Sequence, residues 1–182
     1  MKELSLHILD VAENGISAGA DQIEIEVIED RGQNRLTLVI ADDGRGIPRD
    51  QIDRAVDPFY TSRTTRRVGM GLSLLNAAAR QCDGHMWIES DVGKGTRIVA
   101  EFMYDHIDRA PVGDMAGTMI SLIMGSPSVD FEYRHAVDGR EFVLSTREIK
   151  EALDGRPITD PDVFQYIMQT LRTGEKRLTE GG

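Results

Sequence analysis

The sequence predicts an α/β protein in which helices alternate with short strands. Apolar side chains recur at spacings of three and four over residues 3–18 and again over 72–82, as on one face of a helix. Residues 22–30 alternate apolar with polar side chains, as in a strand that is solvated on one face. The apolar run at 35–41 predicts a second strand, and the turn residues Gly32-Gln33-Asn34 between the two runs indicate a hairpin.

The remaining elements of the first hundred residues follow from the same patterns. A short helix is expected over 49–55, with Pro48 near its start. Residues 57–67 are polar and basic and have no period, so we expect a mobile loop there. Two more strands are expected at 85–90 and 96–104, on either side of a glycine-containing turn.

The composition shifts after Tyr104, which suggests a first domain of residues 1–104 and a small α+β extension of residues 105–182. The extension would pack on the first domain and serve partner recognition or dimerisation, or it would be a stabilising addition. Its expected elements are a helix at 114–124 capped by Asp114, a hairpin of strands at 129–135 and 140–144 around Val137-Asp138-Gly139, a helix at 145–153 that begins with a capping box, and a last helix from Asp160-Pro161 to about Gly174.

Composition and charge exclude several classes of protein. The chain has 182 residues, 40% of them apolar, and its net charge is 21 − 31 = −10, which disfavours general nucleic-acid binding. A lone Cys82 rules out an internal disulfide framework, and four scattered histidines rule out a Cys/His metal cluster. The charged N-terminus does not resemble a signal peptide, and no apolar stretch could span a membrane. These features predict a cytoplasmic protein without membrane partners.

Four short motifs rich in glycine and polar side chains follow one another in the first hundred residues. They are a first helix with Asp10, Glu13 and Asn14, a strand that ends in Asp42-x-Gly44-x-Gly46, a loop with Phe59 and a basic cluster that ends in Gly69-x-Gly71-Leu72 at a helix start, and Gly93-x-Gly95-Thr96 at the start of a strand. Each motif alone is weak, because a single Gly-x-Gly or Asp-Gly more often marks a turn. Their order and spacing together are specific.

The chain resembles the ATP-binding domain of the GHKL superfamily, which has the Bergerat fold. The motifs HILDVAENGISAGA, DDGRGI, DPFYTSR, VGMGLSLL and DVGKGTRI carry this resemblance over residues 3–104. The resemblance implies a two-layer α/β sandwich, in which a mixed sheet has its helices on one face. ATP would lie between the helices and a flexible loop, and ATP and Mg²⁺ are the expected cofactors.

The resemblance also assigns roles to individual residues. Asp42 would accept a hydrogen bond from the adenine amino group, with a turn-forming role as the alternative. Asn14 would be the Mg²⁺ ligand, with backbone capping as the alternative, since Mg²⁺ keeps several waters and needs few protein oxygens. The full expected ATP-binding set is Asn14, Asp42, Gly44, Gly46, Ile47, Phe59, Arg63, Arg67, Gly69, Met70, Gly71, Leu72 and Thr96.

Within that set, the residues for the phosphates come from the loop and the helix that follows it. Gly69 and Gly71 precede a helix N-terminus, where free N–H groups favour phosphate, although they could equally be hinges of the loop. Arg63 and Arg67 could reach the phosphates, and a solvated loop is as good an interpretation. Phe59 could anchor the loop or belong to the core, and for Thr96 an ordinary strand position is the better interpretation.

Asp10 marks a departure from the hydrolytic members of the superfamily. Those members have a glutamate four residues before the metal-binding asparagine, as the general base for water. Aspartate is shorter by about 1.5 Å, one carbon–carbon bond, and a displacement near 1 Å can cost roughly a hundredfold in rate. We therefore expect Asp10 to be at best a weak catalytic base and ATP hydrolysis to be slow.

The short loop at 57–71 resembles that of histidine kinases more than that of topoisomerases. Such kinases carry a phosphoaccepting histidine, commonly followed by an acidic residue, but the four histidines here precede Ile8, Met86, Ile107 and Ala136. The sequence thus predicts a stand-alone kinase that phosphorylates a partner protein. The alternatives are a nucleotide-dependent binding switch of the anti-sigma-factor type and a slow ATPase that cycles as a homodimer.

Overall fold

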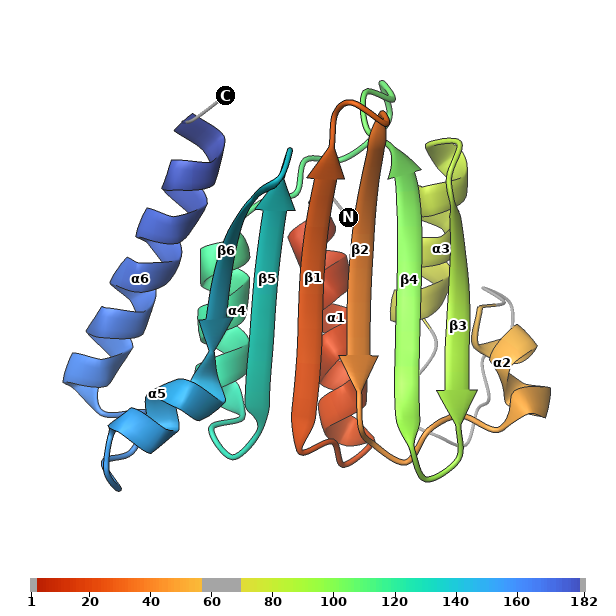
Figure 1. The fold of residues 1–182 in the computed structure, drawn as a ribbon. Coiled ribbons are helices and arrows are strands. Elements are labelled where there is room, and N and C mark those ends of the chain that lie inside the picture. Colours follow the sequence, from red (N-terminus) through yellow and green to blue (C-terminus); the bar gives the residue numbers. More distant parts are fainter. Residues whose placement is uncertain (1–2, 57–69, 181–182) are drawn as a thin grey trace.

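One mixed β-sheet of six strands organises the computed structural model, which describes residues 3–56 and 70–180. The strand order is β3-β4-β2-β1-β5-β6 (Figure 1). The elements are α1 (Leu4–Ser17), β1 (Gln22–Asp30), β2 (Arg35–Asp42), α2 (Arg49–Ala55), α3 (Met70–Gln81), β3 (His85–Asp91), β4 (Gly95–Met103), α4 (Met115–Gly125), β5 (Asp130–Val137), β6 (Arg140–Ser145), α5 (Thr146–Ala152) and α6 (Pro161–Glu180).

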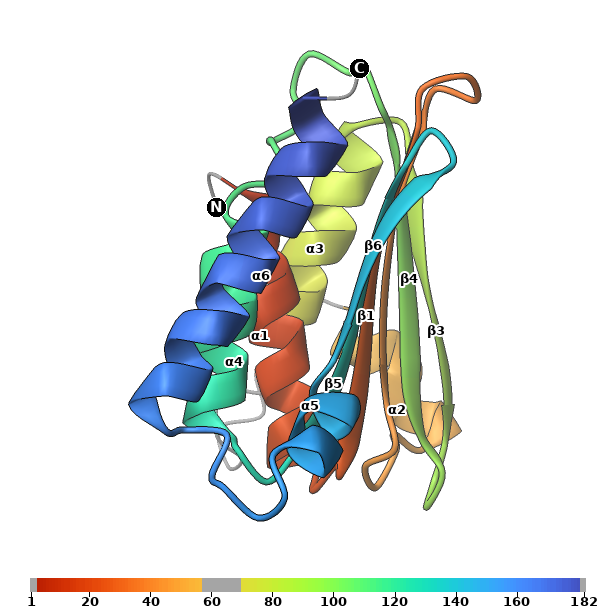
Figure 2. The same cartoon turned by 60° about the vertical axis from the view of Figure 1, so that its left-hand side comes forward.

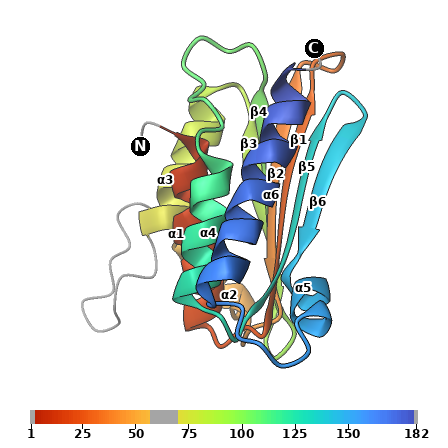
Figure 3. The same cartoon turned by 90° about the vertical axis from the view of Figure 1, so that its left-hand side faces the viewer.

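The four longer helices cover one face of the sheet, so the predicted two-layer sandwich is confirmed (Figure 2). On β1 the side chains of Ile23, Ile25 and Val27 are completely buried, whereas the glutamates between them are only partly covered. This alternation produces one apolar face, against which α1, α3, α4 and α6 lie as a layer (Figure 3).

The strands of the C-terminal segment extend this same sheet. β5 pairs in parallel with β1, from Gln22 opposite Asp130 to Glu29 opposite Val137, and β6 then pairs antiparallel with β5. One hydrophobic cluster contains side chains from both parts of the chain, including Phe102 and Tyr133. The division at residue 104 stays a prediction.

Local signals for the caps and turns of this segment are present in the structure. The Asp114 side chain accepts a hydrogen bond from the N–H of Gly117 (2.8 Å) at the start of α4, and Ser145 caps α5. In the β5–β6 turn, Asp138 and Gly139 have positive φ angles of 48° and 83°, as a tight hairpin turn requires.

The predicted end of the last helix near Gly174 is wrong, because α6 continues to Glu180. Gly174 is buried inside the helix, where a Cβ atom would lie 2.3 Å from the ring of Phe142. The glycine therefore gives room for the ring rather than ending the helix. Among the described residues, no helix combines the length and the apolar character that crossing a bilayer requires.

Candidate functional site

Several of the predicted site residues that the structure describes lie where β2 ends and β4 begins, at the lower end of the sheet in Figure 1. The last residue of β2, Asp42, is directly opposite Thr96 of β4 and Ile23 of β1. The C-terminal end of α1 lies at the same end, whereas α3 begins beside Asp10, in the middle of α1. Antiparallel pairing thus brings together motifs that are 54 residues apart in the sequence (96 − 42).

Helix α1 passes very close to the end of β2. A Cβ atom at Gly15 would lie 3.0 Å from Cβ and 3.2 Å from Cγ of Asp42, so only glycine gives the helix this approach. Asn14 precedes Gly15 and is half-buried. Gly15 was not among the predicted site residues, although glycine inside a helix costs about 1 kcal/mol and often has a packing reason.

Gly44 and Gly46, the two glycines after Asp42, both lie in close contact with distant parts of the chain. The N–H of Gly44 donates to Asp42 Oδ1 (2.9 Å), and a Cβ at Gly44 would lie 2.9 Å from Cβ of Ala18. Gly46 has a φ of +73°, and a Cβ there would lie 2.1 Å from the carbonyl oxygen of Asp91. Packing and turn geometry therefore explain both glycines, independently of any ligand.

Burial raises the pKa of the Asp42 carboxyl, and the negative charge of Asp43 acts in the same direction. Hydrogen bonds from the backbone of Gly44 and Thr96 oppose this rise by stabilising the carboxylate. Asp42 is thus a half-buried acceptor with only part of its capacity used. Such a group can pair with a neutral donor such as an exocyclic amine.

Ser90 was not predicted from the sequence. Its hydroxyl forms hydrogen bonds with both Ile47 and Thr96, which were predicted. Its hydroxyl accepts from the N–H of Ile47 (2.7 Å), donates to the carbonyl oxygen of Gly95 (2.9 Å) and shares a hydrogen bond with Thr96 Oγ1 (2.8 Å). Thr96 is only 8% exposed, so its hydroxyl serves this internal network.

The start of α3 lies on α1 at Asp10. A Cβ at Gly71 would lie 3.1 Å from Cβ of Asp10, which places Asp10 at the junction of the two helices. Asp10 and Asn14 are four residues apart and so share one face of α1. Next to Gly71, Met70 is 66% exposed and Leu72 is buried in the core. Four predicted residues, Phe59, Arg63, Arg67 and Gly69, lie outside the described residues.

The donor set fits a magnesium ion bound mainly through phosphates. Within residues 3–56 and 70–180 there is no group of three or more His, Cys, Asp or Glu side chains that could hold a metal. Nor does any hydrogen bond join the Asn14 side chain to another described residue, which leaves its amide oxygen available. A single oxygen suits Mg²⁺, which usually keeps waters and takes its other ligands from phosphate.

A cavity of about 620 Å³ opens beside Asp42, within the size range of sites for small molecules. Asn14 and Gly71 are not among its described lining residues, so this cavity borders the predicted site on the side of α2 and β3. Besides Asp42, Gly95 and Thr96, its lining includes Arg49 and Ile52 of α2 and Lys94.

The two-layer sandwich with its mixed sheet is the fold of an ATP-binding α/β domain. Residues 2–106 match the model of a family described as "Histidine kinase-, DNA gyrase B-, and HSP90-like ATPase". The match covers more than half of the chain, and the chain belongs to this family.

Similar curated proteins are sensor kinases. The sensor protein kinase WalK of Staphylococcus haemolyticus is 32% identical over 97 residues, which are 50% of this chain and 16% of the kinase. WalK of Staphylococcus epidermidis is 33% identical over 87 residues, 45% of this chain and 14% of the kinase. The chain thus corresponds to a small part of these relatives.

Two solved structures share the fold. The N-terminal domain of a DNA repair protein has a TM-score of 0.55 at 16% identity and covers 80% of this chain and 53% of that one. The Aquifex aeolicus MutL ATPase domain, solved with ADP, has a TM-score of 0.53 at 14% identity and covers 85% of this chain and 70% of that one. The likeness in fold therefore extends beyond residue 106, where the family match ends.

Proposed function

We propose that this chain is a histidine-kinase-type module that binds Mg-ATP and transfers its terminal phosphate to a separate partner protein. The observation that carries the proposal is the convergence of α1, the end of β2 and the start of α3, documented by the approaches of Gly15 to Asp42 and of Gly71 to Asp10. The similarity of this domain to sensor kinases supports the choice of phosphotransfer.

Each residue of the site has a part in this proposal. Asp42 accepts a hydrogen bond from the adenine amino group, and Asn14 holds Mg²⁺ through its amide oxygen. The first N–H groups of α3, from Gly71 onward, face the phosphates, because a helix start offers free donors and a favourable dipole. When bound, Mg²⁺ supplies charge neutralisation on the phosphates. Asp10 is too short for an efficient general base, which favours transfer over hydrolysis.

A second candidate function is a nucleotide-dependent switch that holds or releases a partner without phosphotransfer. The observation in its favour is that the C-terminal segment belongs to the same sheet as the nucleotide site, through the pairing of β5 with β1. A nucleotide at Asp42 could then alter a surface of that segment. A slow ATPase that works as a dimer is the remaining alternative.

Replacing Asn14 with alanine tests the metal part of the site. The Asn14→Ala variant is expected to bind Mg-ATP at least about tenfold more weakly than wild type, as metal-site changes typically do, and to bind metal-free ADP as wild type does. Calorimetric titration measures both affinities. Asn76→Ala, the same substitution on α3, is the control and should bind both ligands normally. Equal losses for both ligands would contradict the assignment of Asn14 to the metal.

Phosphotransfer itself can be observed with γ-labelled ATP in a cell extract. We expect the wild-type chain to label a second protein and the Asn14→Ala variant to label none. If wild type binds Mg-ATP tightly but labels no protein, the kinase proposal fails and the switch is favoured. Steady ATP turnover that Asp10→Asn removes would instead identify an ATPase.

A further inference from the structure

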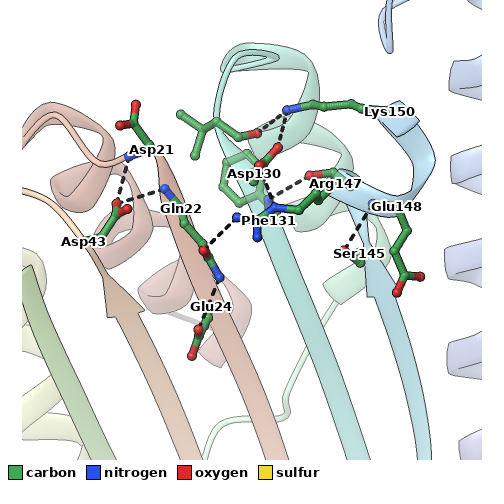
Figure 4. A network of polar contacts seen from close by, with 12 residues as sticks. Asp21, Gln22, Glu24, Asp43, Asp130, Phe131, Ser145, Arg147, Glu148 and Lys150 are labelled. Carbon is green, nitrogen blue, oxygen red and sulfur yellow. Dashed lines mark hydrogen bonds and ion pairs between the residues drawn. The ribbon is translucent and has the colours of Figure 1, made fainter. Parts of the chain in front are cut away.

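We propose that Asp43 is a positioning residue for the nucleotide site, and that a chain of contacts through Gln22 and Arg147 couples this site to α5. The inference rests on the proposed function, because Asp43 directly follows the proposed adenine ligand Asp42. Figure 4 shows the contacts that connect Asp43, Gln22 and Arg147.

The Asp43 carboxylate holds the start of β1. Its Oδ1 atom accepts from the N–H of Asp21 (2.8 Å) and from the N–H of Gln22 (2.9 Å), and its own N–H donates to the carbonyl oxygen of Gln22 (3.3 Å). Three hydrogen bonds thus join the residue after Asp42 to Asp21, directly before β1, and to Gln22, the first residue of β1. They fix the direction in which the chain leaves β2, and therefore where the Asp42 carboxylate points.

The C-terminal segment also forms hydrogen bonds with Asp21 and Gln22, from the other side. The N–H of Asp130 donates to the carbonyl oxygen of Asp21 (2.8 Å), and Arg147 Nη2 donates to Gln22 Oε1 (2.9 Å). Arg147 Nε also donates to Asp130 Oδ2 (3.1 Å), and Lys150 Nζ forms an ion pair with Asp130 Oδ1 (2.8 Å). Residues 21 and 22 therefore link the turn after Asp42 to the first turn of α5.

The two sides of this link are of unequal strength. The Asp43 carboxylate accepts from two backbone donors at once, which makes Asp43 the stronger member, although water can replace part of this contribution because both contacts are exposed. Arg147 is 54% exposed at its side chain, so its contribution is smaller. A partner protein that binds α5 would therefore change the position of the turn at Asp42 through these contacts. By reciprocity, a nucleotide bound at Asp42 would change the affinity of α5 for that partner.

The first test compares two substitutions of Asp43 by ADP titration, under conditions in which each variant is folded. Asp43→Ala is expected to weaken ADP binding about fivefold, the equivalent of one lost hydrogen bond. Asp43→Asn keeps one acceptor oxygen and is expected to bind within about twofold of wild type. Lower thermal stability of Asp43→Ala with unchanged affinity would show a merely structural role and overturn the proposal.

The second test concerns the coupling to α5. Arg147→Ala is expected to weaken ADP binding about twofold and to speed amide hydrogen exchange at Asp21, Gln22 and Gly44. The control is Arg156→Ala, which removes an arginine that is 55% exposed and paired with Asp160, and it should change neither property. Exchange rates that are the same in Arg147→Ala and wild type would overturn the coupling.

The two proposals fail in different ways. If wild type binds no ADP or ATP, the proposed function fails, and the role of Asp43 in positioning a nucleotide fails with it. The exchange measurement needs no ligand, so it still decides whether α5 holds the turn. If wild type binds ADP but Asp43→Ala binds it equally well, the positioning role alone is wrong.

Discussion

Replacing His135 with leucine is expected to lower the free energy of unfolding by about 3–5 kcal/mol at neutral pH, the usual cost of breaking a buried charge pair. His135 on β5 is buried between two carboxylates, with Nε2 2.9 Å from Glu29 of β1 and Nδ1 2.8 Å from Glu175 of α6. Tyr133 also donates to Glu175 (2.7 Å). Leucine would leave both glutamates without the cation between them.

The same cluster predicts that stability falls at alkaline pH. Although burial disfavours the imidazolium, the hydrogen bonds from the ring to Glu175 and Glu29 outweigh it and raise the pKa of His135 to about 9, from an ordinary value of 6.5. Because the folded state holds this proton more tightly, its contribution is complete below pH 6.5 and is lost as the pH rises through 9. The loss should be about 3 kcal/mol in total.

Urea unfolding at pH 6 and pH 9 measures both effects. In the His135→Leu variant the decline over this range should largely disappear, since the titrating group is gone. His85→Leu is the control: the side chain of His85 is 65% exposed, and its loss should change stability by less than about 0.5 kcal/mol. A wild-type stability that stays flat between the two pH values would contradict a protonated, buried His135.

Local patterns in the sequence were sufficient for most of the elements, whereas the layer arrangement was predicted from the resemblance to the GHKL superfamily. Apolar side chains recur with a period of two in β1 and with a period near 3.6 in the helices. This periodicity identifies the buried face of each element. The position of the strands in the sheet is a different matter. β1 lies between β2 and β5, and the parallel contact with β5 joins residues about a hundred apart in the sequence, for which no local signal exists.

In the candidate site, too, local motifs could be predicted from the sequence, whereas contacts between distant residues could not. Asp42 and the glycines after it could be singled out, because a strand that runs into Asp-x-Gly-x-Gly is a local pattern. The different roles of Asp42 and Asp43 could not, since two adjacent carboxylates look alike until the start of β1 is placed beside them. Likewise, the partners of His135 are 106 and 40 residues away in the sequence.

Gly95 is the position at which one methyl group is expected to damage both the fold and the proposed nucleotide site. It has a φ of +115°, and a Cβ there would lie 1.9 Å from the carbonyl oxygen of Asp42 and 2.8 Å from Cα of Asp43. These are backbone atoms, so the clash can be relieved only by moving β4 away from the end of β2. We expect Gly95→Ala to lose roughly 3 kcal/mol or more of stability, combining backbone strain with disrupted packing.

The neighbouring turn glycine separates this effect from backbone strain alone. Gly93 also has a positive φ, +81°, but a Cβ there would meet nothing within 4 Å. Gly93→Ala should therefore cost only about 1–2 kcal/mol, the usual penalty for a left-handed backbone, and should leave ADP affinity unchanged. Gly95→Ala should lose affinity even where it is folded, because Asp42 is displaced. Equal stabilities and affinities for the two variants, measured by urea unfolding and ADP titration, would show that β4 does not approach the end of β2 so closely.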